Sequence, residues 1–75
     1  MFTTEVTAQI AERVAASLAR SDETIASLSR KTDIPRTTLN RKLRGSGEFT
    51  ATELRRISTV LDVRASYLLG ESIAA

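Results

Sequence analysis

The side chains with the clearest chemistry recur between residues 35 and 44, where a short helix is expected. At about 100° per residue, that helix places five polar side chains within an arc of roughly 140°. They are Arg36, Thr37, Asn40, Arg41 and Arg44. Arginine can donate two hydrogen bonds to guanine, asparagine can bind adenine in the same way, and a threonine methyl can pack against thymine. Because Leu39 and Leu43 lie beyond one edge of the arc, the pattern favours a base-reading face over an ordinary exposed helix face.

Positive charge is concentrated on the same stretch. Residues 30–44 contain six basic residues and one acidic residue, Asp33, for a net charge of +5. The rest of the chain has five basic and eight acidic residues, for a net charge of −3, so the whole chain carries +2. A basic segment in an otherwise acidic chain is typical of a surface that faces a polyanion. Accidental clustering on a solvated helix face is the alternative.

The amino-acid inventory argues against an enzyme. The 75 residues include no histidine and no cysteine, which removes the commonest general base and the usual ligands of zinc. No two carboxylates are paired three or four positions apart on one helical face, and Gly45-Ser46-Gly47 follows a helix, whereas a phosphate-binding glycine loop opens a helix after a strand. We therefore expect no catalytic activity, no cofactor and no metal site.

The chain also lacks the features of a membrane or export segment. No run of apolar residues approaches the roughly 18 needed to span a bilayer. Residues 1–9 lack the basic start and the apolar block of a signal peptide. The simplest expectation is a cytoplasmic protein with a single domain over residues 1–75 and a loose tail at 71–75.

Two short helices joined by a tight turn are expected over residues 24–45. The first covers 25–31 and the second covers 35–44. Between them, Asp33 is of a type that tolerates a left-handed backbone. Pro35 suits the first helical position, where no N–H donor is needed. This is the layout of a helix-turn-helix, whose second helix enters the major groove of DNA.

A longer helix is expected before this motif, capped by Thr3 or Thr4. Its apolar side chains recur every four residues and form one stripe. They are Val6, Ile10, Val14 and Leu18. We assign the stripe to the core, since so small a domain needs every apolar stripe it has; a partner-binding or membrane-surface face is the alternative. Thr24 is placed to cap the next helix, with Asp22 as the rival cap.

Two more helices are expected after the motif. Thr50 and Glu53 form a capping box for a helix that ends near Asp62. Its core positions are Leu54, Ile57, Val60 and Leu61. A last short helix over 65–69 is stopped by Gly70.

Gly45-Ser46-Gly47 follows the expected 35–44 helix. It ends that helix, because glycine supplies the positive φ of a helix stop. Its backbone N–H groups and the Ser46 hydroxyl suit a phosphate contact, although a plain linker turn is equally consistent. Arg55 and Arg56, one turn into the next helix, are expected in solvent rather than against the DNA backbone.

Two segments carry a resemblance to a known family: LSRKTDIPRTTLNRKLRG at 28–45 and TELRRISTVLDVRASYLLG at 52–70. In this order they resemble the phage-repressor and Cro type of helix-turn-helix domain, and the resemblance extends from Val6 to Gly70. It implies an all-α, compact five-helix domain like that of lambda repressor. It also implies a sequence-specific regulator of transcription that binds double-stranded DNA, of the kind that phages and mobile elements use as repressors.

The resemblance implies roles for individual residues. It assigns base reading to Arg36, Thr37 and Arg41, a backbone or base-methyl contact to Thr38, and a phosphate contact to Thr24. Combined with the helix projection and the basic cluster, these roles give two expected sets. Base contacts are expected from Arg36, Thr37, Asn40 and Arg41. Phosphate contacts are expected from Thr24, Thr38, Lys42, Arg44 and Ser46.

Three positions depart from the family pattern. Ile25 stands where relatives often have a phosphate-binding glutamine, and Asp33 stands where they usually have glycine. Lys42 occupies a place where many relatives bury an apolar side chain, and we expect Leu43 to take over that packing. Such a change would rotate the second helix of the motif slightly.

The expected partner is an operator in double-stranded DNA, with an inverted repeat if the protein is a homodimer. Leu68, Leu69 and Ile73 are candidate dimer contacts, and they are equally consistent with the last edge of the core. No membrane partner and no small-molecule ligand are expected. The alternative function is a protein-interaction module on the same fold, such as the antitoxin of a toxin–antitoxin pair.

Overall fold

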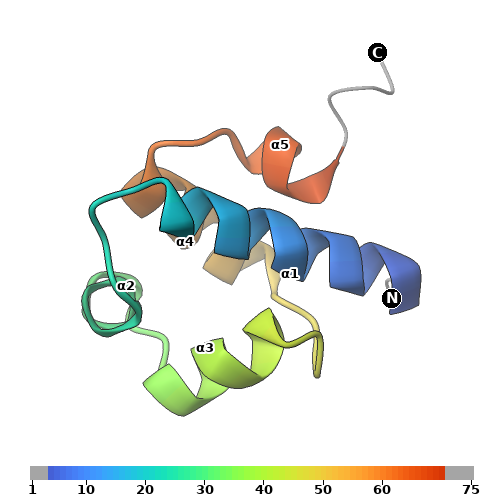
Figure 1. The fold of residues 1–75 in the computed structure, drawn as a ribbon, viewed down its shortest axis with the longest axis horizontal. Coiled ribbons are helices and arrows are strands. Elements are labelled where there is room, and N and C mark those ends of the chain that lie inside the picture. Colours follow the sequence, from blue (N-terminus) through green and yellow to red (C-terminus); the bar gives the residue numbers. More distant parts are fainter. Residues whose placement is uncertain (1–3, 71–75) are drawn as a thin grey trace.

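The computed structural model describes residues 4–70, and the regular secondary structure of this range is entirely α-helical (Figure 1). The helices are α1 (Thr4–Ala19), α2 (Ile25–Thr32), α3 (Arg36–Leu43), α4 (Ala51–Leu61) and α5 (Ala65–Leu69). The expected all-α architecture of five helices is confirmed. The bounds of the motif shift slightly, because α2 continues to Thr32 while Pro35 and Arg44 flank α3 as its caps.

One hydrophobic core joins the five helices. α1 packs against α3, α4 and α5, and α2 packs against α3 and α4. In Figure 1, α1 crosses the molecule between α5 and α3, with α4 behind it and α2 seen end-on beside α3. The most deeply buried apolar side chains come from every helix: Ile10, Val14, Leu28, Leu39, Ile57 and Leu68. None of the helices within residues 4–70 is long and apolar enough to cross a membrane.

The four-residue stripe of α1 belongs to this core. Ile10 and Val14 are buried, and Val6 and Leu18 pack against them at the two ends of the helix. The interpretation of the stripe as core is therefore confirmed. Thr3, one of the two expected caps, lies outside the described residues.

The turn between α2 and α3 is held by hydrogen bonds from both sides. Asp33 adopts the expected left-handed conformation, with φ 62° and ψ 30°. The Ser29 hydroxyl donates to the carbonyl of Ile34 at 2.6 Å. From α4, the Arg56 guanidinium donates to the carbonyl of Thr32 at 3.2 Å. Since Ile34 is also buried, the turn fixes how α3 leaves α2.

The loop between α3 and α4 ends in the expected capping box. Gly45 and Gly47 both have positive φ, at 87° and 125°. Thr50 then accepts a hydrogen bond from the Glu53 backbone N–H at 3.1 Å, and the Glu53 carboxylate accepts one from the Thr50 N–H at 2.8 Å. At the other end of α4, Asp62 is the left-handed C-cap, with φ 58°.

The C-terminal helix is held by two arginines, Arg13 in α1 and Arg20 just after its end. Arg13 donates to the carbonyl of Tyr67 at 3.0 Å and lies 5.2 Å from the centre of its ring. Arg20 donates to the Tyr67 hydroxyl at 3.1 Å. Gly70 ends α5 in the left-handed conformation, as the sequence predicts.

One expected dimer contact is corrected by this packing. Leu68 has no exposed surface, because it points into the core from α5. It therefore cannot touch a second subunit, and the alternative role as the last edge of the core is the right one. Leu69 is partly buried and packs on the core, while Ile73 and the expected loose tail at 71–75 lie outside the described residues.

The Glu53 carboxylate is the acid most closely tied to α3. Burial alone would raise its pKa, but hydrogen bonds from the Lys42 ammonium and the Thr50 N–H, together with the Lys42 charge, outweigh burial and lower the pKa below its ordinary 4.5. The unfolded chain then takes up a proton here at a higher pH than the folded chain does. The contribution to stability is complete above the unfolded pKa and is lost as the pH falls through the folded pKa.

A backbone prediction follows from Asp33, whose side chain is exposed. A β-branched residue in left-handed backbone costs about 1–2 kcal/mol, so we expect Asp33→Val to lower the free energy of unfolding by that amount. Asp33→Gly should remain within about 1 kcal/mol of the wild type, since the relief of strain opposes the greater freedom of the unfolded chain. Urea unfolding followed by circular dichroism measures both. Equal losses in the two variants would contradict this account.

A pH prediction follows from Glu53. Glu53→Gln keeps a side chain that can complete the capping box but removes the charge beside Lys42. We expect the free energy of unfolding at neutral pH to fall by about 1 kcal/mol. The difference from the wild type should shrink from about pH 5 toward pH 3, as measured by urea unfolding at several pH values. A difference that stays constant over this range would show that the Glu53 charge is not responsible.

Candidate nucleic-acid interface

The outer face of α3 is polar and open to solvent. Five side chains that the helix projection groups together are all exposed: Arg36, Thr37, Asn40, Arg41 and Arg44. Leu39 faces the other way and is fully buried in the core. Thr38, which lies beside the arc, is half-buried. The structure thus exposes the whole set of expected base-reading residues on one eight-residue helix, whose opposite face packs into the core through Leu39.

Arg41 is folded back onto the loop that follows α3. Its Nη1 donates a hydrogen bond to the carbonyl of Ser46 at 3.0 Å. A Cβ at Gly47 would lie only 2.8 Å from the same Nη1, so the guanidinium occupies space that a side chain at Gly47 would take. Arginine has five N–H donors, which leaves further donors of Arg41 for an outside partner.

Lys42 lies on the inward face of α3, contrary to the prediction from the sequence. It is only 8% exposed, whereas Leu43 is half-buried. Its Nζ lies 2.7 Å from Oε1 of Glu53 and 5.9 Å from the centre of the Phe49 ring. Lys42 itself thus fills the inward place that we expected Leu43 to take over. The expected phosphate contact from Lys42 is at odds with this burial.

The inward position of Lys42 could have been found from the sequence. At about 100° per residue, Lys42 falls about 60° from Leu39, on the side away from the polar arc. Its charge hid that position, because lysine is rarely buried unless it is paired. Glu53, the acid of the predicted capping box, was the residue in the sequence that could have indicated an ion-pair partner for Lys42.

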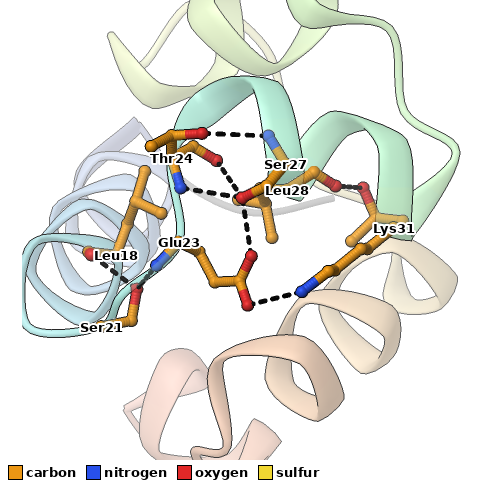
Figure 2. Close-up of polar contacts among 8 residues, drawn as sticks. Leu18, Ser21, Glu23, Thr24, Ser27, Leu28 and Lys31 are labelled. Carbon is orange, nitrogen blue, oxygen red and sulfur yellow. Dashed lines mark hydrogen bonds and ion pairs between the residues drawn. The ribbon is translucent and has the colours of Figure 1, made fainter.

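The start of α2 is a second candidate contact region. Thr24 is its N-cap and is exposed, which decides between Thr24 and Asp22. Thr24 Oγ1 accepts a hydrogen bond from the Ser27 N–H at 3.1 Å, and Ser27 Oγ accepts one from the Thr24 N–H at 2.8 Å (Figure 2). Leu28 N–H makes the first bond along the helix, to the Thr24 carbonyl. The N–H groups of residues 25 and 26 therefore point out of the helix start.

An acidic side chain next to this helix start, Glu23, is paired with a lysine of the motif. Figure 2 shows Glu23 between Ser27 and Lys31: it accepts a hydrogen bond from the Ser27 hydroxyl at 2.6 Å and one from the Lys31 ammonium at 2.8 Å. These two bonds, the one from Lys31 first, lower the pKa of Glu23 below its ordinary value. An anion near Thr24 would thus meet a carboxylate already paired with a cation. The sequence does not reveal this pair, because its members are eight positions apart.

In the basic cluster, the six basic residues of 30–44, lysines and arginines therefore lie in different environments. Both of its lysines, Lys31 and Lys42, form ion pairs with acids from outside residues 30–44. The four arginines of the cluster are exposed: Arg30, Arg36, Arg41 and Arg44. Arg56 has a further role that sequence reasoning missed, since it hydrogen-bonds the α2 carboxyl end while remaining largely in solvent.

No group of three metal-binding side chains occurs among residues 4–70. The exposed chemistry of α3 fits nucleic acid, because guanidinium, amide and hydroxyl groups on one helix are the groups that bind base edges and phosphates.

Comparison with known families agrees with this assignment. The family model for the Cro/C1-type helix-turn-helix DNA-binding domain matches residues 13–70. The match covers α2 to α5 and the second half of α1. No curated protein and no solved structure gave a match. Because the family model spans most of the chain, the protein belongs to the Cro/C1-type helix-turn-helix family of DNA-binding domains.

Proposed function

We propose that this protein is a sequence-specific regulator of transcription that reads the major groove of double-stranded DNA with α3, and that it acts as a phage or mobile-element repressor. The observation that carries the proposal is the exposed polar face of α3, opposite the buried Leu39. The family match supports DNA binding in general, and the specific roles below rest on the side chains.

The proposed base contacts come from Arg36, Thr37, Asn40 and Arg41. Arg36 and Thr37 occupy the first turn of α3, the end from which recognition helices of this type contact bases. Asn40 lies on the same exposed face. Each arginine that grips a guanine with two hydrogen bonds would contribute about 1–3 kcal/mol of discrimination against other bases.

The proposed phosphate contacts are fewer than the sequence predicts. Arg44 and Ser46 follow α3 and are exposed, and the exposed Thr24 opens α2, where the first backbone N–H groups have no acceptor within the helix. Thr38 is half-buried and stays in the set as a hydroxyl donor at the edge of the face. Lys42 is withdrawn from the set, because its ammonium is bound to Glu53.

We further propose that the protein binds an inverted repeat as a homodimer. One small reader covers only a short half-site, and two-fold dimers of such domains bind half-sites about one helical turn apart. Of the expected contacts, Leu69 and Ile73 remain as candidates, since Leu68 is enclosed by the core.

Selection of binding sites from a random DNA pool, followed by sequencing, tests the proposal directly. We expect an enriched inverted repeat whose half-sites are about one helical turn apart. An enriched single half-site would retain specific reading but contradict the dimer. Binding that is sensitive to salt but enriches no sequence would contradict base reading altogether.

Two arginines, Arg36 in α3 and Arg44 at its C-cap, should behave differently when replaced by alanine. Arg36→Ala should relax the preference at one base position of the selected site, at a cost of about 1–3 kcal/mol. Arg44→Ala should weaken binding to all sequences about equally and reduce the salt slope by about 1. Affinities measured over a range of salt concentrations, on the selected site and on scrambled DNA, separate the two effects. If Arg36→Ala weakens both DNAs equally, Arg36 is a phosphate contact.

A further inference from the structure

α3 is joined to α4 by side chains rather than by close-packed backbones. No Cα atom in residues 36–43 lies within 8 Å of one in residues 51–61, whereas α3 approaches both α1 and α2 this closely. The connecting loop contains two glycines with positive φ, Gly45 and Gly47. The orientation of α3 on this side therefore depends on the side chains that reach from one helix to the other.

Lys42 makes that connection, from the last turn of α3 to the first turn of α4. Its ammonium lies 2.7 Å from Glu53 Oε1 and above the ring of Phe49, a core residue in the connecting segment. The same Oε1 accepts the hydrogen bond from the Thr50 N–H that completes the capping box. The cation of the recognition helix is thus bound to an oxygen whose position the start of α4 already fixes.

We propose that the Lys42–Glu53 pair sets the orientation of α3 and so determines base preference, without itself touching DNA. The inference rests on the proposed reading of DNA by α3. An apolar pair of similar volume is often as stabilising as a buried ion pair, so stability alone does not account for lysine here. An ion pair does account for it, because it ties Lys42 to one carboxylate oxygen, and a bidentate contact to a base tolerates little displacement of the helix.

The chain contains a matched control for this pair. Lys31 and Glu23 form an ion pair of nearly the same length, 2.8 Å. However, the Lys31 side chain is 47% exposed, against 11% for Lys42. The Lys31 pair connects the last turn of α2 to Glu23, the residue before its N-cap (Figure 2), and joins no second helix. Replacing Lys31 removes the same charge from the same basic cluster and leaves the α3–α4 connection intact.

The experiment compares Lys42→Met with Lys31→Met on the selected DNA site and on sites with single base-pair changes. We expect Lys42→Met to reduce the affinity ratio between the best site and its variants at least tenfold, with the salt slope unchanged. Lys31→Met should keep the ratio within twofold of the wild type. Lys42→Arg, whose guanidinium can still reach Glu53, should restore most of the preference. Thermal unfolding of each variant confirms that the protein is folded.

Three results would overturn the inference. One is a Lys42→Met protein that discriminates between sites as well as the wild type. Another is uniformly weaker binding with a salt slope reduced by about 1, which would make Lys42 a phosphate contact. The third is a DNA-free Lys42→Met protein in which residual dipolar couplings report the wild-type angle between α3 and α4.

The same design separates this inference from the proposed function. A wild type that prefers no DNA sequence contradicts the proposed function, while the dipolar couplings still decide whether Lys42 orients α3. If Lys42→Met fails to fold, Glu53→Gln takes its place, because it keeps the capping box and weakens only the bond to Lys42. Wild-type discrimination and an unchanged α3 angle in Glu53→Gln would then count against the pair.

Discussion

The burial of Leu39 is the constraint on which the reading face of α3 depends. α3 has eight residues, and isolated helices shorter than about 12–15 residues are marginal in water. The helix therefore persists because α1 and α2 pack against it and Leu39 is fully buried in the core. Since side chains on a helix have fixed angular positions, the burial of Leu39 also decides which residues face outward. Arg36 and Asn40 are exposed as a consequence of core packing.

The lysines and the arginines of the basic cluster make different contacts. Lysine combines a flexible apolar stem with a compact charge, so Lys42 can lie along the core and still bring its ammonium to Glu53. Arginine presents a planar fork of donors that suits guanine and phosphate. With Lys31 and Lys42 paired internally, the outward field of the motif comes from arginines. Counting charges along residues 30–44 therefore overstates the number of cations that are free to meet DNA.

Local signals explain why so much of the fold could be predicted from the sequence. The capping threonines Thr24 and Thr50 and the stop at Gly70 act within one or two helical turns, and each lies where it was expected. The residues that were misplaced depend on distant contacts. Lys42 is buried because its ammonium pairs with the carboxylate of Glu53, eleven positions away. Leu68 is buried because α1 covers α5, and a five-residue helix is too short for its periodicity to reveal an inner face.

The candidate site was predictable for a related reason, but only as a set of exposed residues. The angular projection placed the polar face of α3 correctly, since a regular helix leaves few alternatives. It could not show where flexible side chains rest once they are outside. Arg41 hydrogen-bonds the Ser46 carbonyl in the loop, and Lys31 pairs with Glu23, the residue before the N-cap of α2. Both contacts depend on side-chain lengths and on groups that only the folded chain brings together.

The resting place of Arg41 bears on how the proposed reading would work. Ordering a long side chain at an interface costs about 0.5–1.5 kcal/mol, and a guanidinium already bonded to the Ser46 carbonyl has lost part of that freedom before DNA arrives. The bond requires close approach to Gly47, where a Cβ would lie 2.8 Å from Nη1. If Arg41 reads a base from this position, the loop glycine belongs to the reading surface although it has no side chain. If Arg41 must leave the loop, binding gives up the bond to Ser46, and the first turn of α3 carries most of the discrimination.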